Sequence, residues 1–239
     1  MKKPTPLVVI SILFLGFVVW SSVRTSEIPE APKATITIPE GWNIYQVNQH
    51  LKDQQVLVDG EIPLSEEGYI FPDTYEFFLD SSLDVVTGKF KSNFEDRLAQ
   101  INLSNQTRDL DDILTMASIL EKEVQTLREK RIASGVLWKR ISAGMPLQVD
   151  ATICYIKRDQ PCLPITRSDK EIDSPYNTYL YRGLPPGPIS NPGSDSIVAA
   201  ANPIETSYWY YISDHEKDVT VFSKTLDEHN ANIVKYLND

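Results

Sequence analysis

A run of 20 uncharged residues near the start of the chain constrains its fold more than any other feature. The run covers residues 4–23, and its apolar centre at residues 7–20 (LVVISILFLGFVVW) has a single polar interruption. A helix of this length is long enough to cross the roughly 30 Å hydrocarbon layer of a membrane. Lys2 and Lys3 precede the run and favour an N-terminus held in the cytoplasm. We therefore expect residues 1–24 to form a cytoplasmic tip and a membrane-spanning anchor, with the rest of the chain outside the cytoplasm.

A cleaved signal peptide is the alternative interpretation of this run. Signal peptides end in a cleavage site of small residues, and no A-x-A-like site follows the apolar segment in this sequence. We therefore favour a single-pass anchor in the cytoplasmic membrane over a cleaved signal.

Charge is distributed unevenly along the 239 residues. The chain has 33 acidic and 23 basic side chains, and three of the basic ones (Lys2, Lys3 and Arg24) lie in the first 24 residues. Residues 25–239 therefore carry 20 positive and 33 negative charges, a net charge of −13. Such a surface repels phosphate backbones, which argues against nucleic acid as a partner. The overall content of 41% hydrophobic and 23% charged residues is typical of a folded protein.

The part after the anchor divides into a linker, a small unit and a larger domain. Residues 25–34 (TSEIPEAPKA) contain two prolines and no periodicity, which indicates a short, stiff linker. A predicted strand at Thr35–Ile38 and a predicted helix at Trp42–Leu51 follow, in a unit that we place at residues 35–64. A unit this short cannot bury a core of its own, so we expect it to pack on the larger domain at residues 65–239.

One carboxyl group interrupts the apolar side of a predicted helix. Residues 110–124 (LDDILTMASILEKEV) have a helical period, and Glu121 falls between Leu110 and Leu114 in the middle of the apolar arc. Burial disfavours the charged form of a carboxyl group, so we expect Glu121 to hold a proton near neutral pH and to act as a general acid. The alternative is a structural Glu that is satisfied by a buried Arg or by backbone donors. Glu123 faces another sector of the helix and is the weaker candidate.

Three segments rich in turn residues and aromatic residues predict loops around a groove. They are Glu66–Phe77, Ser174–Tyr181 and Gly183–Gly193. Tyrosine offers a flat face with a polar tip, and Asn and Thr offer directional hydrogen bonds, which together suit a sugar polymer. The alternative is that these residues only build the walls of an irregular domain. Gln148 and Asp150 alternate along an extended segment, so we expect both to point into the same cleft.

The remaining elements follow from local patterns. A helix is expected at about Arg131–Ser142, a hairpin from residues 208–212 and 219–222, and a last helix after Thr225, where Glu228 completes a capping box.

Cys154 and Cys162 flank a predicted hairpin turn. A disulfide between them suits a location outside the cytoplasm. Nucleophilic thiols are the weaker alternative, because no histidine lies nearby in the sequence. The histidines lack the spacing of metal ligands, so we expect neither a metal nor a cofactor.

Six motifs, in order along the chain, resemble those of the MltG/YceG-like endolytic murein transglycosylases. They are EGYIFPDTYEF (Glu67–Phe77), ASILEKE (Ala117–Glu123), RIASGVLWKRISAGMPLQVDATICY (Arg131–Tyr155), SPYNTYLYRGLPPGPISNPG (Ser174–Gly193), SIVAAANP (Ser196–Pro203) and FSKTLDEHN (Phe222–Asn230). The resemblance implies a YceG-like catalytic domain of mixed α+β class behind a membrane anchor.

This resemblance implies cleavage inside peptidoglycan strands, between N-acetylmuramic acid and N-acetylglucosamine, with formation of 1,6-anhydro ends. The family's catalytic residue is the first Glu of the ASILEKE motif, which is Glu121 here. The candidates for the groove around it are Glu67, Tyr69, Gln148, Asp150, Asn177, Thr178 and Tyr179.

The sequence departs from the family pattern on its N-terminal side. Family members usually carry a complete LysM-like subdomain, and residues 35–60 resemble only its opening, so we interpret residues 35–64 as a shortened LysM-like subdomain. The resemblance also implies work beside wall-synthesis enzymes such as penicillin-binding proteins. Two other functions stay open: a muramidase-type hydrolase in which Asp150 activates water for Glu121, and a non-catalytic peptidoglycan-binding or assembly protein.

Overall fold

The structure is a computed structural model that describes residues 31–103, 106–158, 162, 164–214 and 219–237. The chain divides into two compact units, residues 1–32 and residues 33–239. The anchor predicted at residues 1–24 lies outside the described residues. Within the described ranges, no helix is both long and apolar enough to span a membrane.

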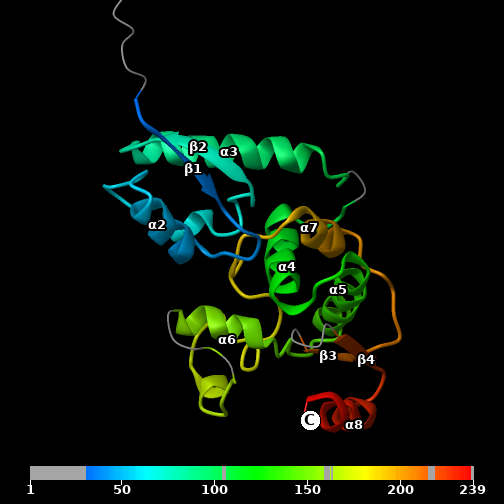
Figure 1. Cartoon of the computed structure of the whole chain (residues 1–239). Coiled ribbons are helices and arrows are strands. Elements are labelled where there is room, and N and C mark those ends of the chain that lie inside the picture. Colours follow the sequence, from blue (N-terminus) through cyan, green and yellow to red (C-terminus); the bar gives the residue numbers. More distant parts are fainter. Residues whose placement is uncertain (1–30, 104–105, 159–161, 163, 215–218, 238–239) are drawn as a thin grey trace, which may run out of the picture. The chain divides into compact units, whose positions relative to one another are not determined.

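The described part of the second unit alternates helices with two short sheets, so the mixed α+β class is confirmed (Figure 1). Each sheet has two antiparallel strands, β1 with β2 and β3 with β4. The elements are β1 (Lys33–Thr37), α2 (Ile44–Asp53), β2 (Thr74–Phe78), α3 (Leu83–Ala99), α4 (Leu110–Glu123), α5 (Leu127–Ser142), α6 (Asp150–Lys157), α7 (Ser194–Ala201), β3 (Tyr210–Asp214), β4 (Val219–Ser223) and α8 (Leu226–Leu237). Single 3₁₀ turns lie at Leu64–Glu66 and Asp169–Glu171.

The first four elements, β1, α2, β2 and α3, enclose one hydrophobic core, and we call them the N-terminal lobe. The strands pair from Lys33 with Phe78 to Thr37 with Thr74. Their inward side chains and those of the two helices form the core: Ile36, Ile38, Ile44, Val47, Leu51, Val56, Leu57, Ile62, Ile70, Tyr75, Phe77, Val86 and Phe90. These core residues lie on both sides of the expected boundary after residue 64, which stays a prediction.

Two parts of this lobe differ from the sequence-based expectations. Residues 74–77 were expected in a loop but belong to strand β2, because Tyr75 and Phe77 alternate inward between exposed neighbours. Helix α3 was not expected, since Val86, Phe90 and Phe94 are its only buried residues among those described and make a thin apolar stripe. Both elements depend on tertiary burial more than on local pattern.

The other elements, α4 to α8 with β3 and β4, surround a second core, and we call them the C-terminal lobe. Helix α4 is central: residues 113–120 are all buried, and the helix packs against α5, α6 and α7. Figure 1 shows α4, α5 and α7 gathered in the middle of the molecule. The core includes Ile113, Leu114, Met116, Ile119 and Leu120 of α4 and Ala199, Ala200 and Ala201 of α7.

Several expectations for the C-terminal lobe are confirmed. Residues 131–142 fall inside α5, and β3 and β4 form the expected hairpin. The last helix begins at Leu226, where the Glu228 N–H donates to Thr225 Oγ1 at 3.2 Å, as expected for an N-cap.

The segment around Gln148 and Asp150 differs from its prediction. Gln148 lies in a loop with φ of 55° and has an exposed side chain, whereas Asp150 begins helix α6. The two residues therefore do not alternate along one extended face.

Cys154 lies within helix α6 and not in a hairpin, and it forms a disulfide with Cys162 over a Cα–Cα distance of 5.1 Å.

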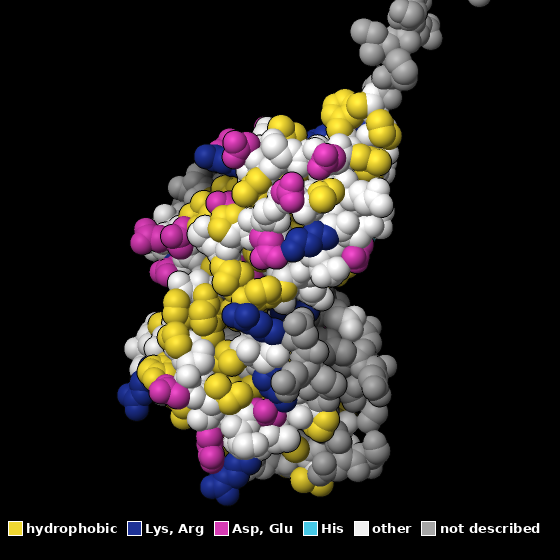
Figure 2. Space-filling model, turned by 90° about the vertical axis from the view of Figure 1, so that its left-hand side faces the viewer, with side chains coloured by type: hydrophobic (Ala, Val, Ile, Leu, Met, Phe, Trp, Pro, Cys, Tyr) yellow, Lys and Arg dark blue, Asp and Glu magenta, His cyan; other side chains and the backbone are white. Residues whose placement is uncertain are grey.

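Figure 2 shows the face of the molecule on the side of α2 and α6. Hydrophobic side chains gather across the middle of this face, and acidic side chains lie mainly above this band. The band follows the level at which the two lobes meet.

Candidate active site

Glu121 lies in the last turn of α4, and its side chain is only 8% exposed. The Lys130 Nζ atom is 3.1 Å from its Oε1 atom. The Gly193 backbone N–H and the Ser196 hydroxyl donate to Oε2 at 2.9 Å and 2.7 Å. All three partners are donors, so both carboxyl oxygens act as hydrogen-bond acceptors.

These donors come from two neighbouring helices. Lys130 lies near the start of α5 and is 4% exposed, so the ion pair with Glu121 is buried. Gly193 is the N-cap residue of α7, and Ser196 lies in its first turn. The N-terminus of a helix attracts negative charge, which adds to the hydrogen bonds at this end of α7.

The expectation that the Glu121 carboxyl group has apolar surroundings is wrong, because its contacts are hydrogen-bond donors. A helical wheel shows only the neighbours of Glu121 on α4, whereas its contacts come from α5 and α7. The local arrangement is closer to the alternative of a Glu satisfied by a buried cation and backbone donors. Such an arrangement fixes the position of the carboxyl group, which a catalytic acid or base also requires.

Asn191 connects both lobes beside this site and was missed by the sequence analysis. It is fully buried, and its Oδ1 atom accepts hydrogen bonds from the Gly68 and Ile70 N–H groups at 3.0 Å each. Its Nδ2 atom donates to the Trp42 carbonyl oxygen at 3.0 Å. Asn191 therefore fixes the segment that leads to Gly193. The density of turn residues around it was the only available signal.

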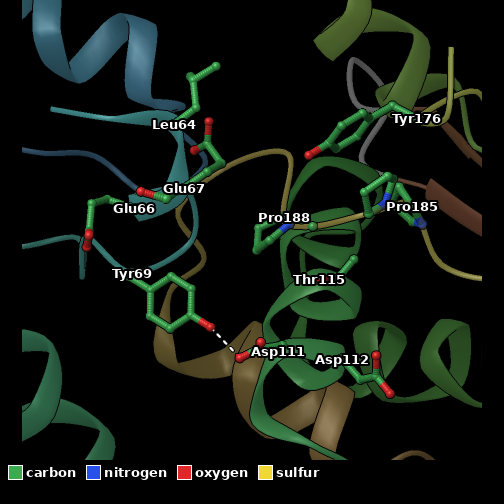
Figure 3. Close-up of a pocket in the computed structure, with 13 residues that line it drawn as sticks. Leu64, Glu66, Glu67, Tyr69, Asp111, Asp112, Thr115, Tyr176, Pro185 and Pro188 are labelled. Atoms are coloured by element: carbon green, nitrogen blue, oxygen red, sulfur yellow. Dashed lines mark hydrogen bonds between the residues drawn. The ribbon is translucent and has the colours of Figure 1, made fainter. Parts of the chain in front are cut away.

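A cleft of about 510 Å³ lies beside this region, and its described lining does not include Glu121. It is lined by Leu64, Ser65, Glu66, Glu67, Tyr69, Asp111, Asp112, Thr115, Tyr176, Pro185, Pro186, Gly187 and Pro188. Figure 3 shows Tyr69 directed at Asp111, with 2.5 Å between the Tyr69 hydroxyl and Oδ1. Two of the predicted groove residues, Glu67 and Tyr69, thus share one cleft.

Glu67 is only 3% exposed, and its carboxyl group contacts the N-terminus of α2, which begins at Ile44. Both carboxyl oxygens accept from the Ile44 N–H, at 3.2 Å and 3.1 Å. Desolvation raises the pKa of Glu67 to about 7, although hydrogen bonds from Ile44 and Tyr155 oppose the rise. Glu67 is therefore able to exchange a proton near neutral pH.

Asp150 and Tyr179 belong to a different group of side chains. The Tyr179 hydroxyl donates to Asp150 Oδ1, and Glu123 accepts from the Ala151 N–H and the Tyr211 hydroxyl, each at 3.4 Å. Desolvation raises the pKa of Glu123 to about 7, and the nearby charge of Asp150 adds to the rise. The sequence analysis ranked Glu123 low because it faces another sector of the helix than the apolar arc, and nothing local in the sequence places Asp150 beside it.

Asn177 and Thr178 are buried and bind to the protein itself. Asn177 Nδ2 donates to the carbonyl oxygens of Lys170 and Ile172, and Thr178 Oγ1 accepts from the Val149 N–H at 3.0 Å. Their side chains hold the 170–181 loop and do not line the described cleft.

Over the described residues, no group of three or more His, Cys, Asp or Glu side chains is arranged to hold a metal ion.

Comparison with known proteins places the chain in a family. The model of the YceG-like family matches residues 19–235. The chain belongs to the YceG-like family. A crystal structure described as a putative YceG-like protein from Listeria monocytogenes superimposes with a TM-score of 0.74 and 32% identity, over 84% of this chain and 76% of that one.

Two curated relatives of this YceG-like chain carry the name endolytic murein transglycosylase. The one from Bacillus subtilis (strain 168) is 38% identical over 177 residues, which are 72% of this chain and 48% of the relative. The one from Streptococcus pneumoniae serotype 2 (strain D39) is 26% identical over 258 aligned positions, which cover 90% of this chain and 46% of the relative. The chain thus spans about half the length of the curated relatives it matches.

Proposed function

We propose that this YceG-like chain is an endolytic lytic transglycosylase that cleaves glycan strands of peptidoglycan. The observation that carries the proposal is the hydrogen-bonded position of Glu121 at the end of α4, within the ASILEKE motif. The names of the curated relatives support the same activity.

Glu121 serves as acid and then as base in the proposed reaction. In its protonated form, Glu121 gives the proton to the glycosidic oxygen as the bond from this oxygen to C1 of N-acetylmuramic acid breaks. The C6 hydroxyl group of the same sugar then forms a bond to C1 and returns its proton to Glu121. The product is a 1,6-anhydro end, and no water is consumed. Because the nucleophile belongs to the substrate, one well-positioned carboxyl group is sufficient.

The neighbouring groups keep Glu121 in place for both steps. Lys130 and the N-terminal end of α7 hold its two oxygens in fixed directions. The cleft that contains Glu67 and Tyr69 is open to solvent and has an aromatic and proline-rich wall, which suits the rings and hydroxyl groups of a glycan strand.

A hydrolase would need a second carboxyl group to activate water. The sequence suggested Asp150 for this role, but Asp150 pairs with Tyr179 beside Glu123. Among the described side chains, those hydrogen-bonded to Glu121 are Lys130 and Ser196. This placement argues against Asp150 as the group that activates water for Glu121.

Analysis of the ends produced from peptidoglycan tests the proposal. The purified chain, its Glu121→Gln variant and a control variant, Glu95→Gln, are incubated with the same peptidoglycan, and the products are identified by mass spectrometry. Glu95 is exposed on α3 and serves as the matched control. We expect anhydro ends from the wild type and the control only. Reducing ends would indicate the hydrolase, and intact strands would indicate a binding or assembly protein.

The membrane placement and the partners are part of the same proposal. Residues 4–23 anchor the chain in the cytoplasmic membrane with its body outside, residues 35–64 act as a shortened LysM-like subdomain, and the enzyme ends growing strands beside penicillin-binding proteins. The uncharged run and the preceding lysines support the anchor. An alkaline phosphatase fusion after residue 34 should be active, and an inactive fusion would contradict this topology.

A further inference from the structure

The turn between β1 and α2 brings a second carboxyl group to the neighbourhood of Glu121. Glu40 lies in this turn, and a Cβ atom built on Gly193 would overlap the Glu40 carboxyl group. The N–H of the same glycine donates to Glu121. One residue of the C-terminal lobe therefore contacts both carboxyl groups, and its lack of a side chain leaves the space for Glu40.

Hydrogen bonds from the C-terminal lobe fix the turn that carries Glu40. The Gly41 N–H donates to the Asn191 carbonyl oxygen at 2.9 Å, and the Asn191 N–H donates to the Trp42 carbonyl oxygen at 2.7 Å. Lys122 Nζ donates to the Gly41 carbonyl oxygen at 3.3 Å. A Cβ atom on Gly41 would lie 3.6 Å from Glu121 Cγ, so the turn runs directly past the catalytic side chain.

The carboxyl groups of Glu40 and Glu121 differ in accessibility, and the charge of Glu121 affects the pKa of Glu40. Glu40 is exposed, whereas Glu121 is almost completely buried. Desolvation raises the pKa of Glu40, the charge of Glu121 raises it further, Lys130 opposes the rise, and Asp195 adds to it. Glu40 is thus an accessible acceptor group beside a buried acid, in a site that the proposed reaction requires a sugar to enter.

We propose that Glu40 is a substrate-binding residue of the active site, whose carboxyl group accepts a hydrogen bond from a hydroxyl or amide group of the sugar on which Glu121 acts. This inference rests on the proposed transglycosylase function. A hydrogen bond from a sugar to a carboxylate is charge-assisted and contributes more than a neutral one. The N-terminal lobe is then a part of the active site and not a separate binding module.

Steady-state kinetics test this role. The substrate is glycan strands freed of their peptides, and the variants are Glu40→Ala and a control, Glu76→Ala, from an exposed position on β2 of the same lobe. We expect Glu40→Ala to raise KM about tenfold with a smaller change in kcat, because a charge-assisted hydrogen bond to the substrate is lost. Glu76→Ala should match the wild type. Equal KM values for Glu40→Ala and wild type would overturn the inference and leave the proposed function intact.

A binding measurement separates this inference from the proposed reaction. The same strands are titrated into the Glu121→Gln variant and into the double variant Glu40→Ala with Glu121→Gln, so that no turnover is needed. About tenfold weaker binding by the double variant supports the contact, even if the wild type produces no anhydro ends. Equal binding by the two variants overturns the contact.

Gly193→Ala offers a second route that keeps the Glu40 side chain present. Gly193 has a φ of −79°, so alanine suits its backbone, and the new Cβ atom would displace the Glu40 carboxyl group. The substitution should lower kcat/KM more in the wild type than in the Glu40→Ala background, where the carboxyl group is already absent. Equal fold-losses in the two backgrounds would contradict a role for the position of Glu40.

Discussion

The Nζ atom of Lys130 lies 3.1 Å from Oε1 of Glu121, and these side chains are 4% and 8% exposed. Removing one partner of such a buried pair leaves the other charge without compensation. We therefore expect Lys130→Met to lower the free energy of unfolding by about 3–5 kcal/mol, measured by urea denaturation, and to reduce production of glycan ends.

The double variant Lys130→Met with Glu121→Gln is the control for this pair. It has no uncompensated charge, so it should be more stable than Lys130→Met alone. A double variant whose loss of stability equals the sum of the two single losses would contradict a buried ion pair.

Glu121 and Lys130 show how far the sequence can predict this site. Glu121 stood out because it interrupts an apolar arc on its own helix. Lys130 was not singled out, because the expected helix began at Arg131, whereas in the structure it lies on the buried side of α5 with Ala133 and Leu137. Their pairing could not be predicted, because it depends on how α4 and α5 pack. The contact between Glu40 and Gly193 spans more than half the chain and has no local pattern at all.

The fold follows the same division. Helices with a wide apolar face, such as α4, were predictable from their period. The hairpin of β3 and β4 was predictable from two runs of aromatic and β-branched residues on either side of a polar turn. Helix α3 has a narrow buried stripe, and strand β2 follows a turn-rich segment, so both depend on partners that are distant in the sequence. Asp150 was predicted on an extended segment because polar residues two positions apart, Gln148 and Asp150, fit the alternation of a strand. So short a pattern does not distinguish a strand from a loop that leads into the first turn of a helix, which is what the structure has.

Glu67 should make the stability of the protein depend on pH. Its pKa is raised by desolvation from 4.5 to about 7, so the folded state binds this proton more tightly than the unfolded state. The contribution of Glu67 is complete below about pH 4.5 and is lost as the pH rises to about 7, a change of about 3 kcal/mol. Glu67→Gln should therefore gain stability relative to wild type over this range, in urea denaturation at a series of pH values. A difference that is independent of pH would contradict this assignment.

Asn191 should be important for folding as well as for the site. Asn191→Ala removes the oxygen atom that accepts hydrogen bonds from the Gly68 and Ile70 N–H groups. It also removes the amide group that donates to the Trp42 carbonyl oxygen. Since these groups are buried or nearly so, we expect a loss of about 3 kcal/mol or more in the free energy of unfolding. Asn230→Ala, at an exposed position of α8, should stay within about 0.5 kcal/mol of wild type. Equal stabilities of the two variants would refute this role of Asn191.

The disulfide between Cys154 and Cys162 should stabilise the C-terminal lobe. It closes a loop with a sequence separation of 8, which restricts the unfolded chain and contributes about 2–3 kcal/mol. A reducing agent should lower the Tm of the wild type and leave the Tm of the double serine variant unchanged. The same Tm for wild type with and without reductant would show that the bond does not contribute.

The most direct test of the central claim is the oxygen content of the new glycan ends. Peptidoglycan is digested by the wild type and by Glu121→Gln in water enriched in the heavy oxygen isotope, and the ends are analysed by mass spectrometry. The proposed reaction predicts 1,6-anhydro ends without heavy oxygen from the wild type and a loss of nearly all of these ends in Glu121→Gln. Reducing ends that carry heavy oxygen, or full activity of Glu121→Gln, would contradict a transglycosylase that depends on Glu121.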